Sequence, residues 1–200
     1  MKRIKIHDLL ADKNVLKQFC EDVKNGAVTV IPTDTLYGFA VSYDSEEAVD
    51  KVYKIKNRDS RKPLILFVTK FEDLEPLGLK ASESAKEPII KNWPGALTAI
   101  LARPESGKLS NFRFPTIGVR APAHNDLLKL LDILPTKVLT TSANRSGAPS
   151  DTDPDNIEKE FQNEVDWLVE DGVLPSGVPS TVVDFTSFPH KILRQGKIII

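Results

Sequence analysis

The chain has 200 residues, and its 27 basic side chains nearly balance its 28 acidic ones, which leaves a formal net charge of −1. This balance argues against a protein that binds nucleic acid through bulk basicity, although it does not exclude a local basic patch. Cys20 is the only cysteine, which excludes an internal disulfide and a cysteine-cluster metal site, and its place on the apolar face of an expected helix predicts a role in filling the core. No apolar stretch reaches the length of a signal peptide or a membrane span, so we expect a soluble, cytoplasmic protein with no membrane partner.

The apolar periodicity predicts helices and strands that alternate along the chain. In chain order we expect a helix at 15–23, a strand at 27–31, a helix at 48–55 capped by Ser45, a strand at 64–68, a helix at 82–91, a turn at 93–95, strands at 97–101 and 117–120, a helix from 125 or 126 to 131, a strand at 138–141, a helix at 155–161, and strands at 166–170, 181–185, 191–194 and 197–200. Strands and helices that interleave in this way predict an α/β sandwich around a mixed sheet. Residues 144–156 are rich in Pro, Ser, Asp and Asn, which favours a mobile loop.

Common nucleotide-binding and hydrolytic motifs are missing from the sequence. There is no G-x-x-x-x-G-K-[ST] and no G-x-G-x-x-G, so neither a P-loop nor a Rossmann fingerprint is present. There is also no H-E-x-x-H and no G-x-S-x-G. If the protein binds a nucleotide, the binding site must therefore use a different motif.

Two hydroxyls and a carboxylate follow the strand expected at 27–31. They are Thr33, Asp34 and Thr35, within the segment PTDTLYG at 32–38. The end of a strand is the usual place for a ligand in an open α/β sheet. A polar turn, in which these side chains satisfy backbone donors, is the favoured explanation when this segment is taken alone.

Basic residues are concentrated between 51 and 62, where an expected helix gives way to a strand. Six residues of this segment are Lys or Arg, and Asp59 is its one acid. The dipole at a helix C-terminus favours cations in such a place. Arg and Lys together can also clamp a polyphosphate, because Arg offers a planar fork and Lys a mobile charge. Both interpretations can hold at once.

Small polar side chains crowd the end of the strand at 138–141 and continue into a Gly/Pro loop that reaches residue 150. Hydroxyls and amides of this kind can bind a ribose, a phosphate or a carboxylate, but a Ser/Asn-rich turn is the default explanation for any one of them. Arg120 and Arg194 each end an apolar strand, where an arginine is costly to bury without an anionic partner. A ligand or an internal salt bridge would satisfy them equally well.

Taken together, these segments resemble the YrdC/TsaC family of threonylcarbamoyl-AMP synthases, in order from about residue 15 to residue 196. The matching segments are PTDTLYG at 32–38, K-x-R at 56–58 followed by Lys62, KPLILF at 62–67, WPGALTAIL at 93–101, TIGVRAPAH at 116–124, TSANRSGAPS at 141–150 and PSTVVD at 179–184. K-x-R alone would be weak, but K-x-R, S-x-N and PSTVVD in this order and spacing are specific. The resemblance implies a single domain over 1–200 with a three-layer α/β fold, a twisted mixed sheet and a concave, basic surface.

The resemblance also implies which residues bind the substrates. The positions that match contacts to L-threonine are Thr35, Arg120, Thr140 and Ser180. The positions that match contacts to ATP or the adenylate are Arg58, Lys62, Thr116, Ser142, Ser150 and Arg194, with Asn144 and Lys56 completing the two motifs. We assign electrostatic catalysis to Lys56, Arg58 and Lys62, and we expect the threonine carboxylate to be the anion that Arg120 needs. Phe67 stands where some longer members carry a His next to threonine, so that contact cannot be carried over.

The implied reaction converts L-threonine, bicarbonate and ATP into threonylcarbamoyl-AMP and pyrophosphate, and the product serves the machinery that modifies a tRNA adenosine next to the anticodon. The threonine amine takes up carbon dioxide as a carbamate, and a carbamate oxygen then attacks the α-phosphorus of ATP. Such catalysis depends on positioning and on neutralising charge, which suits a site of Arg, Lys, Ser, Thr and Asn without a nucleophile–base pair. The segments contain no carboxylate cluster for a protein-held metal, so we expect Mg²⁺ to arrive on the triphosphate.

Two alternatives remain open from the sequence. A module that binds tRNA or double-stranded RNA would use the same phosphate-reading Arg and Lys side chains, although the near-zero net charge and the lack of interleaved aromatics count against it. A paralogue of the same fold without synthase activity is disfavoured by the intact K-x-R and S-x-N motifs. Direct contact with tRNA is compatible with the enzyme as well.

Overall fold

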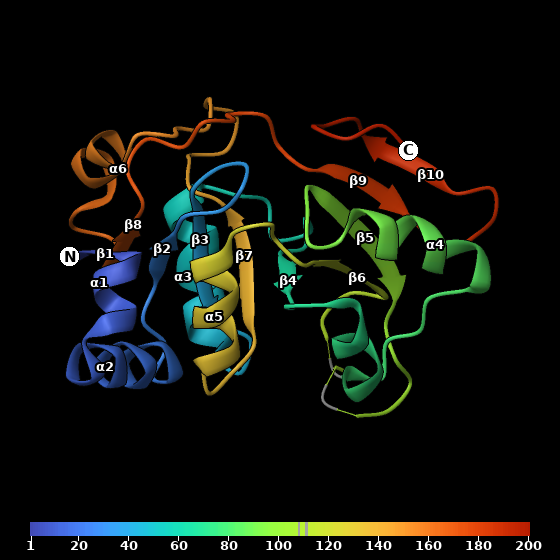
Figure 1. Ribbon diagram of the computed structural model, residues 1–200, viewed down its shortest axis with the longest axis horizontal. Helices are drawn as coiled ribbons and strands as arrows, with labels where there is room; N and C mark the ends of the chain where they lie inside the picture. Colours follow the sequence, from blue (N-terminus) through green and yellow to red (C-terminus); the bar gives the residue numbers. More distant parts are fainter. Residues whose placement is uncertain (108, 111) are drawn as a thin grey trace.

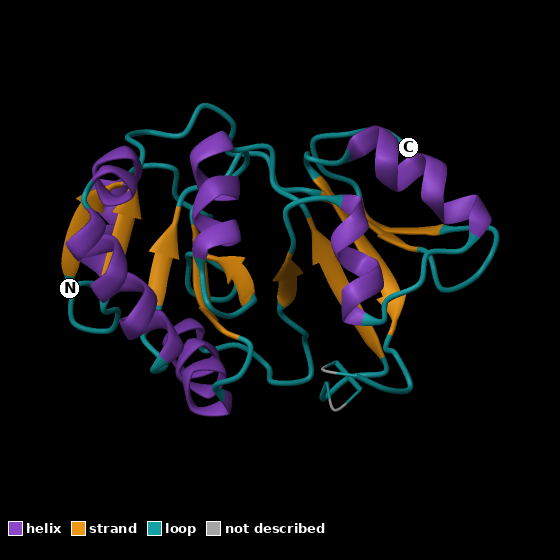
Figure 2. Ribbon diagram, turned by 60° about the horizontal axis from the view of Figure 1, so that its bottom comes forward, coloured by secondary structure: helices purple, strands orange, loops and turns teal. Residues whose placement is uncertain are grey.

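One mixed β-sheet crosses the whole molecule (Figure 1, Figure 2). The computed structural model describes residues 1–107, 109–110 and 112–200, and in this part of the chain the sheet has ten strands. From one edge to the other they are β1 (Lys2–Lys5), β8 (Trp167–Glu170), β2 (Thr29–Ile31), β3 (Gly38–Ser42), β7 (Val138–Ser142), β4 (Ile65–Phe67), β6 (Thr116–Arg120), β5 (Leu97–Ala102), β9 (Thr181–Asp184) and β10 (Lys191–Arg194). Strand β8 pairs in parallel with β1 and β2, β4 with β6, and β5 with β9, whereas the other neighbours are antiparallel.

Helices cover both faces of this sheet, so the molecule has three layers. They are α1 (Ile6–Ala11), α2 (Lys13–Lys24), α3 (Glu46–Lys56), α4 (Glu83–Asn92), α5 (Asn125–Ile133) and α6 (Pro154–Phe161), together with the 3-10 helix η1 (Phe71–Leu77). Buried side chains of α1, α2 and α5 form one hydrophobic cluster with Ala40 and Phe67 of the sheet. Those of α3, α4 and α6 join a larger cluster with Phe39 and Leu66, on the opposite face. The predicted mixed α/β fold is confirmed.

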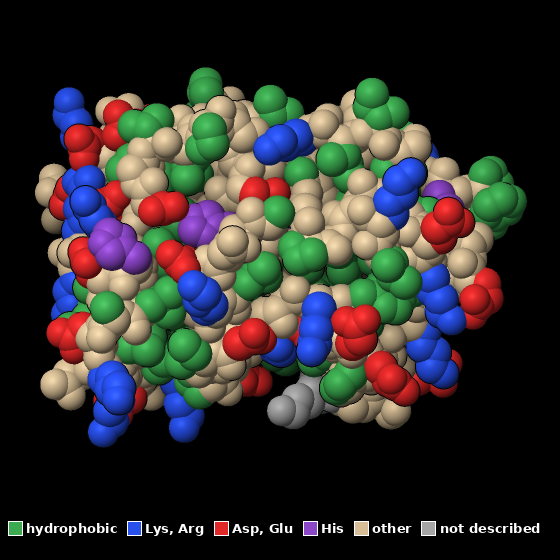
Figure 3. Space-filling model, in the orientation of Figure 1, with side chains coloured by type: hydrophobic (Ala, Val, Ile, Leu, Met, Phe, Trp, Pro, Cys, Tyr) green, Lys and Arg blue, Asp and Glu red, His purple; other side chains and the backbone are tan. Residues whose placement is uncertain are grey.

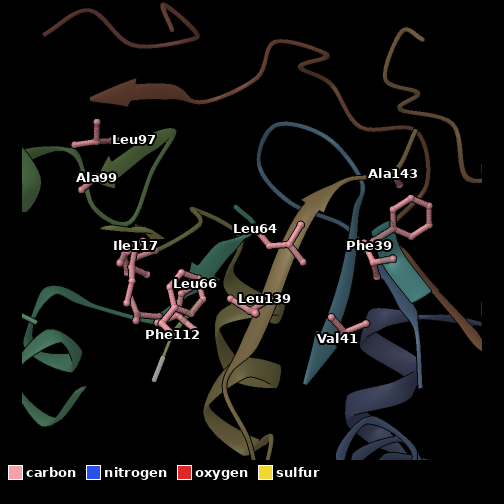
Figure 4. Close-up of a cluster of buried hydrophobic side chains, with 14 of the residues drawn as sticks. Phe39, Val41, Leu64, Leu66, Leu97, Ala99, Phe112, Ile117, Leu139 and Ala143 are labelled. Carbon is pink, nitrogen blue, oxygen red and sulfur yellow. The ribbon is translucent and has the colours of Figure 1, made fainter. Parts of the chain in front are cut away.

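Successive side chains of each central strand point to opposite faces of the sheet, so each face is formed by every second residue. The side chains that enter the larger cluster from these strands include Phe39, Val41, Leu66 and Leu139 (Figure 4). The residues between them face the other way, where Ile65 pairs with Thr140 on one side and with Gly118 on the other. On the same face Gly38 pairs with Ser142. Small and polar residues therefore make up much of this second face.

Most predicted helices and strands are present, with ends that differ by one to a few residues. Ser45 caps α3 as predicted, because its Oγ accepts a hydrogen bond of 3.2 Å from the backbone N–H of Ala48. The apolar patterns of the sequence do not predict β1, α1, β3 or η1. Strand β1 is short, charged and at the edge of the sheet, so it lacks an apolar signal. Cys20 is only partly buried on α2 and fills less of the core than predicted.

The strand predicted at 197–200 is wrong. The backbone N–H groups of Gly196 and Ile198 donate to the Thr181 Oγ1, at 3.0 and 3.3 Å. The N–H of Lys197 donates to the carbonyl of Pro179 at 3.0 Å. Because these donors bind a side chain and a loop instead of a neighbouring strand, the segment folds over 179–181 as irregular chain.

Charged side chains of both signs are interspersed on the face shown in Figure 3. This mixture agrees with the nearly neutral composition. Within the described residues, no helix combines the length and the apolar character needed to cross a membrane.

Candidate active site

A cavity of about 330 Å³ opens on the sheet face that carries Ile65 and Thr140, a size at the lower end of the usual range for small-ligand sites. Three arginines line it, Arg58, Arg120 and Arg194, and none of the lining residues that the structure describes is an acid. The other lining residues are Thr33, Thr35, Leu36, Tyr37, Gly38, Pro63, Ile65, Phe67, Thr140, Thr141, Ser142, Asn144, Ser150, Pro179 and Ser180. The cavity is suited to an anionic ligand with several polar groups.

Two of the arginines approach the cavity beside different parts of the segment 63–67. Arg120 pairs with Phe67 where β6 and β4 end. Arg58 donates from Nη2 to the carbonyl of Pro63, just before β4 begins, at 3.3 Å. A ligand with two anionic groups could therefore contact both cations.

Arg120 is buried and already binds three protein acceptors. Its Nη2 donates to Asp34 Oδ1 at 2.6 Å, its Nη1 to Thr35 Oγ1 at 3.0 Å and its Nε to the Gly95 carbonyl at 3.0 Å. Burial lowers the pKa of Arg120, and the adjacent Asp34 partly offsets this effect. Because a guanidinium has five N–H groups, two remain for a ligand.

Asp34 corrects the sequence argument about the anion of Arg120. We expect from the sequence that a substrate carboxylate supplies this anion, but Asp34 supplies it from within the protein. The internal salt bridge, the alternative left open above, is thus present. That Arg120 binds the threonine carboxylate stays a prediction, which now rests on its two remaining N–H groups.

A chain of hydroxyl groups leads away from Arg120 along the loop after β2. Thr33 Oγ1 donates to the carbonyl of Leu36 at 2.6 Å. Thr33 Oγ1 also accepts from the backbone N–H groups of Thr35 and Leu36, both at 3.1 Å. The hydroxyl oxygens of Thr33 and Thr35 lie 3.0 Å apart. Thr35 Oγ1 accepts a hydrogen bond from Arg120 Nη1, which leaves one lone pair for a ligand.

Arg194 and Ser180 form another part of the wall. Arg194 donates from Nε and Nη2 to the Ser180 carbonyl at 3.1 and 2.8 Å, and from Nη2 to Ser180 Oγ at 3.1 Å. Ser180 Oγ also lies 2.8 Å from Oγ1 of Thr98, a buried residue of β5. These contacts engage Nε and Nη2 of Arg194, so a ligand would meet Nη1. Burial lowers the pKa of Arg194, and the charge of Arg58 lowers it further.

Gly196 lets the chain after Arg194 approach this wall closely. A Cβ added at Gly196 would lie 2.3 Å from the carbonyl oxygen of Pro179 and 2.4 Å from the carbonyl carbon of Ser180. No side chain larger than hydrogen fits between these two backbones. Gly196 is thus required for the approach itself.

The end of α3 turns Lys56 and Arg58 to different sides. Asn57 between them has the left-handed backbone conformation, with φ of 48°, that often ends a helix. Arg58 is half-buried at the cavity and donates to the carbonyls of Lys62 and Pro63, both at 3.3 Å. Burial lowers the pKa of Arg58.

Lys56 is buried behind the lining of the cavity and is 1% exposed. Its Nζ donates to the Ser142 carbonyl at 2.5 Å, and to the carbonyl and Oδ1 of Asn144 at 2.7 and 2.9 Å. The same Nζ lies 5.6 Å from the ring centre of Phe39. Burial is the main cause that lowers the pKa of Lys56 to about 8, with a smaller contribution from Arg58. Lys56 thus joins the end of α3 to the end of β7.

Polar contacts tie down the first part of the loop after β7. The N–H of Ser146 donates to the Lys56 carbonyl at 2.7 Å, and Asn144 Nδ2 donates to the Ala148 carbonyl at 2.6 Å. These hydrogen bonds fix the first part of the loop, although its sequence has no apolar residues at regular spacing that would pack on the core. The segment for which we expect mobility therefore narrows from residues 144–156 to residues 150–152.

The structure brings most of the predicted site residues to the cavity. Those that line it are Thr35, Arg58, Arg120, Thr140, Ser142, Asn144, Ser150, Ser180 and Arg194. Lys56 and Lys62 lie outside the lining, the first buried and the second exposed. Thr116 also lies outside it, two residues before Gly118, the partner of the lining residue Ile65. Thr116 is therefore on the face of β6 that bears the cavity, beyond its edge.

Two residues of this site are missing from the sequence predictions. Asp34 belongs to the PTDTLYG segment, where a polar turn is the favoured explanation, and only its 2.6 Å contact with Arg120 shows its role. Thr98 is a lone polar residue in the apolar run at 97–101, and its isolation is the signal that points to a partner.

Comparison with known proteins assigns the chain to a family. The Sua5_yciO_yrdC family model, described as Telomere recombination, matches residues 21–196. The chain belongs to the Sua5/YciO/YrdC family. It is 33% identical over 175 residues to the threonylcarbamoyl-AMP synthase of Pyrococcus abyssi, and 35% identical over 201 residues to a relative from Methanocaldococcus jannaschii. The family resemblance inferred from the sequence motifs is thus confirmed.

A solved structure of this family has the same fold. Pyrococcus abyssi Sua5 complexed with L-threonine covers 98% of the chain, with 31% identity and a TM-score of 0.83. The chain spans about half the length of the Pyrococcus abyssi protein, 52% in the sequence comparison, and 95% of the Methanocaldococcus jannaschii relative.

Proposed function

We propose that this protein is an L-threonylcarbamoyladenylate synthase, which converts L-threonine, bicarbonate and ATP into threonylcarbamoyl-AMP and pyrophosphate. The observation that carries the proposal is a cavity lined by three arginines and several hydroxyls, with no acid among the lining residues that the structure describes. An amino-acid carboxylate and a triphosphate are two anionic groups that such a cavity would separate and neutralise. The name of the Pyrococcus abyssi relative gives independent support.

L-threonine suits the end of the cavity at Arg120. The two remaining N–H groups of Arg120 would bind its carboxylate as a pair. Thr35 offers a lone pair to the amine, while Thr140 and Ser180 complete this end of the wall. Phe67 lines the same end and brings a ring to the place where some longer family members carry a His. The complex of the related Sua5 with L-threonine supports an amino acid in this fold.

ATP suits the other end of the cavity. Arg58 and the Nη1 of Arg194 would neutralise its phosphates, with Lys62 exposed nearby. The other residues that we assign to ATP are Thr116, Ser142, Asn144 and Ser150. Within the described residues, no group of three or more His, Cys, Asp or Glu side chains could hold a metal ion. Mg²⁺ would accordingly be carried to the site by the triphosphate and would supply charge neutralisation there.

The chemistry then requires placement and charge neutralisation from the protein. Bicarbonate takes up a proton and loses water to give carbon dioxide, and the threonine amine adds to its carbon and releases a proton to solvent, which gives the carbamate. An oxygen of the carbamate then forms a bond to the α-phosphorus of ATP. The bond between this phosphorus and the bridging oxygen breaks, and pyrophosphate leaves with the electron pair. Arg58 and Arg194 would stabilise the charge that develops on the leaving group. The expected rate enhancement comes from alignment and electrostatics, without a covalent intermediate on the protein.

Pyrophosphate release tests this proposal. The purified protein is supplied with ATP, bicarbonate and L-threonine, and release is compared with that in the absence of threonine. Release that depends on threonine supports the synthase. Binding of tRNA or double-stranded RNA without turnover would favour the RNA-binding module, and neither activity would favour a paralogue that is not a synthase.

The chemistry of the product indicates its consumer. A mixed anhydride between a carbamate and AMP is an activated acyl donor, so an acyl transfer must follow. We propose that its acceptor is a tRNA adenosine next to the anticodon, reached through the threonylcarbamoyl-transfer machinery of the cytoplasm. We also propose that residues 1–200 act as a single domain, because one sheet runs through the described part of the chain.

A further inference from the structure

Lys56 completes the K-x-R motif, yet its side chain does not line the cavity. An ammonium group has three N–H donors and no acceptor. In Lys56 these donors meet three oxygens, the Ser142 carbonyl at 2.5 Å and the carbonyl and Oδ1 of Asn144 at 2.7 and 2.9 Å. Lys56 therefore has no N–H group left for a phosphate.

The ammonium of Lys56 fixes the orientation of the Asn144 amide. Oδ1 of Asn144 faces Nζ, and Nδ2 donates to the carbonyl of Ala148 at 2.6 Å. If the amide were turned over, its N–H groups would face an ammonium and its oxygen would face a carbonyl. Both contacts would be repulsive, because each would pair two donors or two acceptors.

This orientation decides how the Ser142 hydroxyl can bind a ligand. Ser142 Oγ lies 2.6 Å from Asn144 Oδ1, and the amide oxygen has no proton to donate. Ser142 is consequently the donor, and its single proton is engaged within the motif. Ser142 also lines the cavity, where only its lone pairs are available. Ionised phosphate oxygens are acceptors, so they do not suit Ser142, whereas an O–H or N–H group does.

We propose that Lys56 is a positioning residue that sets the hydrogen-bond polarity of the S-x-N motif, so that Ser142 Oγ accepts a hydrogen bond from the nucleoside part of ATP. The proposal rests on the proposed function, because it takes the bound nucleotide to be ATP. The donor is a ribose hydroxyl or the adenine amine, which share this chemistry. The charge of Lys56 then acts through Asn144, in place of the direct electrostatic role that the sequence predicts for Lys56.

Binding of nucleotide analogues to the wild type and to Ser142→Ala tests the contact at Ser142. Calorimetry in the presence of L-threonine compares ATP with 2′-deoxy-ATP, 3′-deoxy-ATP and purine riboside triphosphate, which lacks the amine. One analogue should bind the wild type roughly threefold to tenfold more weakly than ATP, the effect of one neutral hydrogen bond. This difference should vanish in Ser142→Ala, and the sensitive analogue identifies the donor. Inorganic tripolyphosphate, which probes only the phosphate subsite, should bind both proteins within about twofold.

The opposite pattern would overturn the proposal. If Ser142→Ala weakens tripolyphosphate and leaves every analogue difference unchanged, Ser142 is a phosphate donor. Lys56→Met should also abolish the preference for ATP, since it frees the amide of Asn144. Should Lys56→Met fail to fold, Asn144→Leu replaces it, and a preference that survives in Asn144→Leu contradicts the proposal.

A measurement without nucleotide separates this proposal from the proposed function. If the wild type binds neither ATP nor tripolyphosphate, the proposed function and the assignment of the Ser142 ligand both fail. The positioning role is then tested by NMR exchange of the Asn144 side-chain amide protons in the free protein. These protons should exchange slowly in the wild type and faster in Lys56→Met and Lys56→Gln. Equal exchange in the wild type and a folded variant would show that Lys56 does not hold this amide.

Discussion

Replacing Gly196 by Ala tests whether the close approach of two backbones positions Arg194. The new Cβ would lie 2.3 Å from the Pro179 carbonyl oxygen, and 2.4 and 2.5 Å from the carbonyl carbon and oxygen of Ser180. All three atoms belong to the backbone, so no side-chain rotation relieves the overlap. The tail and the segment at 179–180 must separate by roughly 1 Å to restore ordinary contact, and overpacking of this kind costs about 1–3 kcal/mol.

The same displacement should disturb the site. Arg194 holds the Ser180 carbonyl at 3.1 and 2.8 Å, and a shift of about 1 Å takes these contacts beyond hydrogen-bonding distance. We therefore expect Gly196→Ala to lower the free energy of unfolding by about 1–3 kcal/mol. We expect it to weaken ATP binding by roughly tenfold, the effect of one misplaced charged donor.

Urea denaturation and calorimetry measure the two effects separately. Gly107→Ala is the matched control, because Gly107 has φ of 90° and an added Cβ meets nothing within 4 Å. Its cost is backbone strain of about 1–2 kcal/mol, without a shift in the site. If Gly196→Ala loses stability like this control but binds ATP as the wild type does, the approach does not position Arg194. A loss of stability below about half a kcal/mol would refute the steric reasoning itself.

Four further predictions concern the cavity and the segments beside it. Arg58→Ala should lower kcat/KM for ATP roughly 10²–10³-fold, because it removes one electrostatic stabiliser; full activity in a folded variant would contradict the assignment. Arg120→Lys should weaken threonine binding in calorimetry, because Lys cannot supply a bidentate fork; normal binding, with unfolding of Arg120→Ala, would show a structural residue. The amides of 150–152 should exchange faster in the free protein than with ATP and threonine bound, whereas that of Ser146, bonded to the Lys56 carbonyl, should be slow in both states; equal exchange at 150–152 would remove Ser150 from the site. Activity should fall as pH rises through about 8, because Lys56, whose pKa burial lowers to about 8 from 10.5, then has too few N–H donors for its three acceptors. Between about pH 8 and pH 10.5 Lys56 binds more protons in the unfolded chain than in the folded one. Its contribution to the free energy of unfolding therefore rises with pH while activity falls. Rate profiles and urea titrations on both sides of about pH 8 check this, and a fall in activity at alkaline pH that is unchanged in Lys56→Arg would belong to another group.

The fold could be predicted as far as local patterns reach. The apolar run at 64–68 and the alternation of strands with capped helices indicate a mixed sheet, because each is a property of neighbouring residues. The order of the strands could not be predicted, since pairs such as β1 with β8 join segments more than a hundred residues apart. The tail at 197–200 has an apolar run, but the N–H of Ile198 donates to the Thr181 hydroxyl and that of Lys197 to the Pro179 carbonyl, and no local pattern predicts these bonds.

The candidate site, like the fold, could be predicted from the sequence only in part. Polar residues at strand ends predict lining residues such as Thr35 and Ser142, because strand ends meet at one edge of the sheet. The use of each donor could not be predicted. The sequence shows that Arg120 needs an anion but not that Asp34 lies 2.6 Å from it. It likewise shows Lys56 within a basic cluster but not that all three of its donors turn toward β7.

The wall built by Ser180 and Arg194 connects ligand binding to the order in which the chain folds. Thr35 lies near the start of the chain, while Arg194 lies far along it, where it donates to Ser180 and the tail up to Ile198 bonds to Thr181. On a ribosome, the earlier half of the cavity would exist for some time without its other wall. In the finished protein, a ligand that bridges both walls draws its affinity partly from a closed hairpin of β9 and β10, and by linkage it must stabilise that hairpin against local opening. Ligand binding and closure of this hairpin should therefore favour each other.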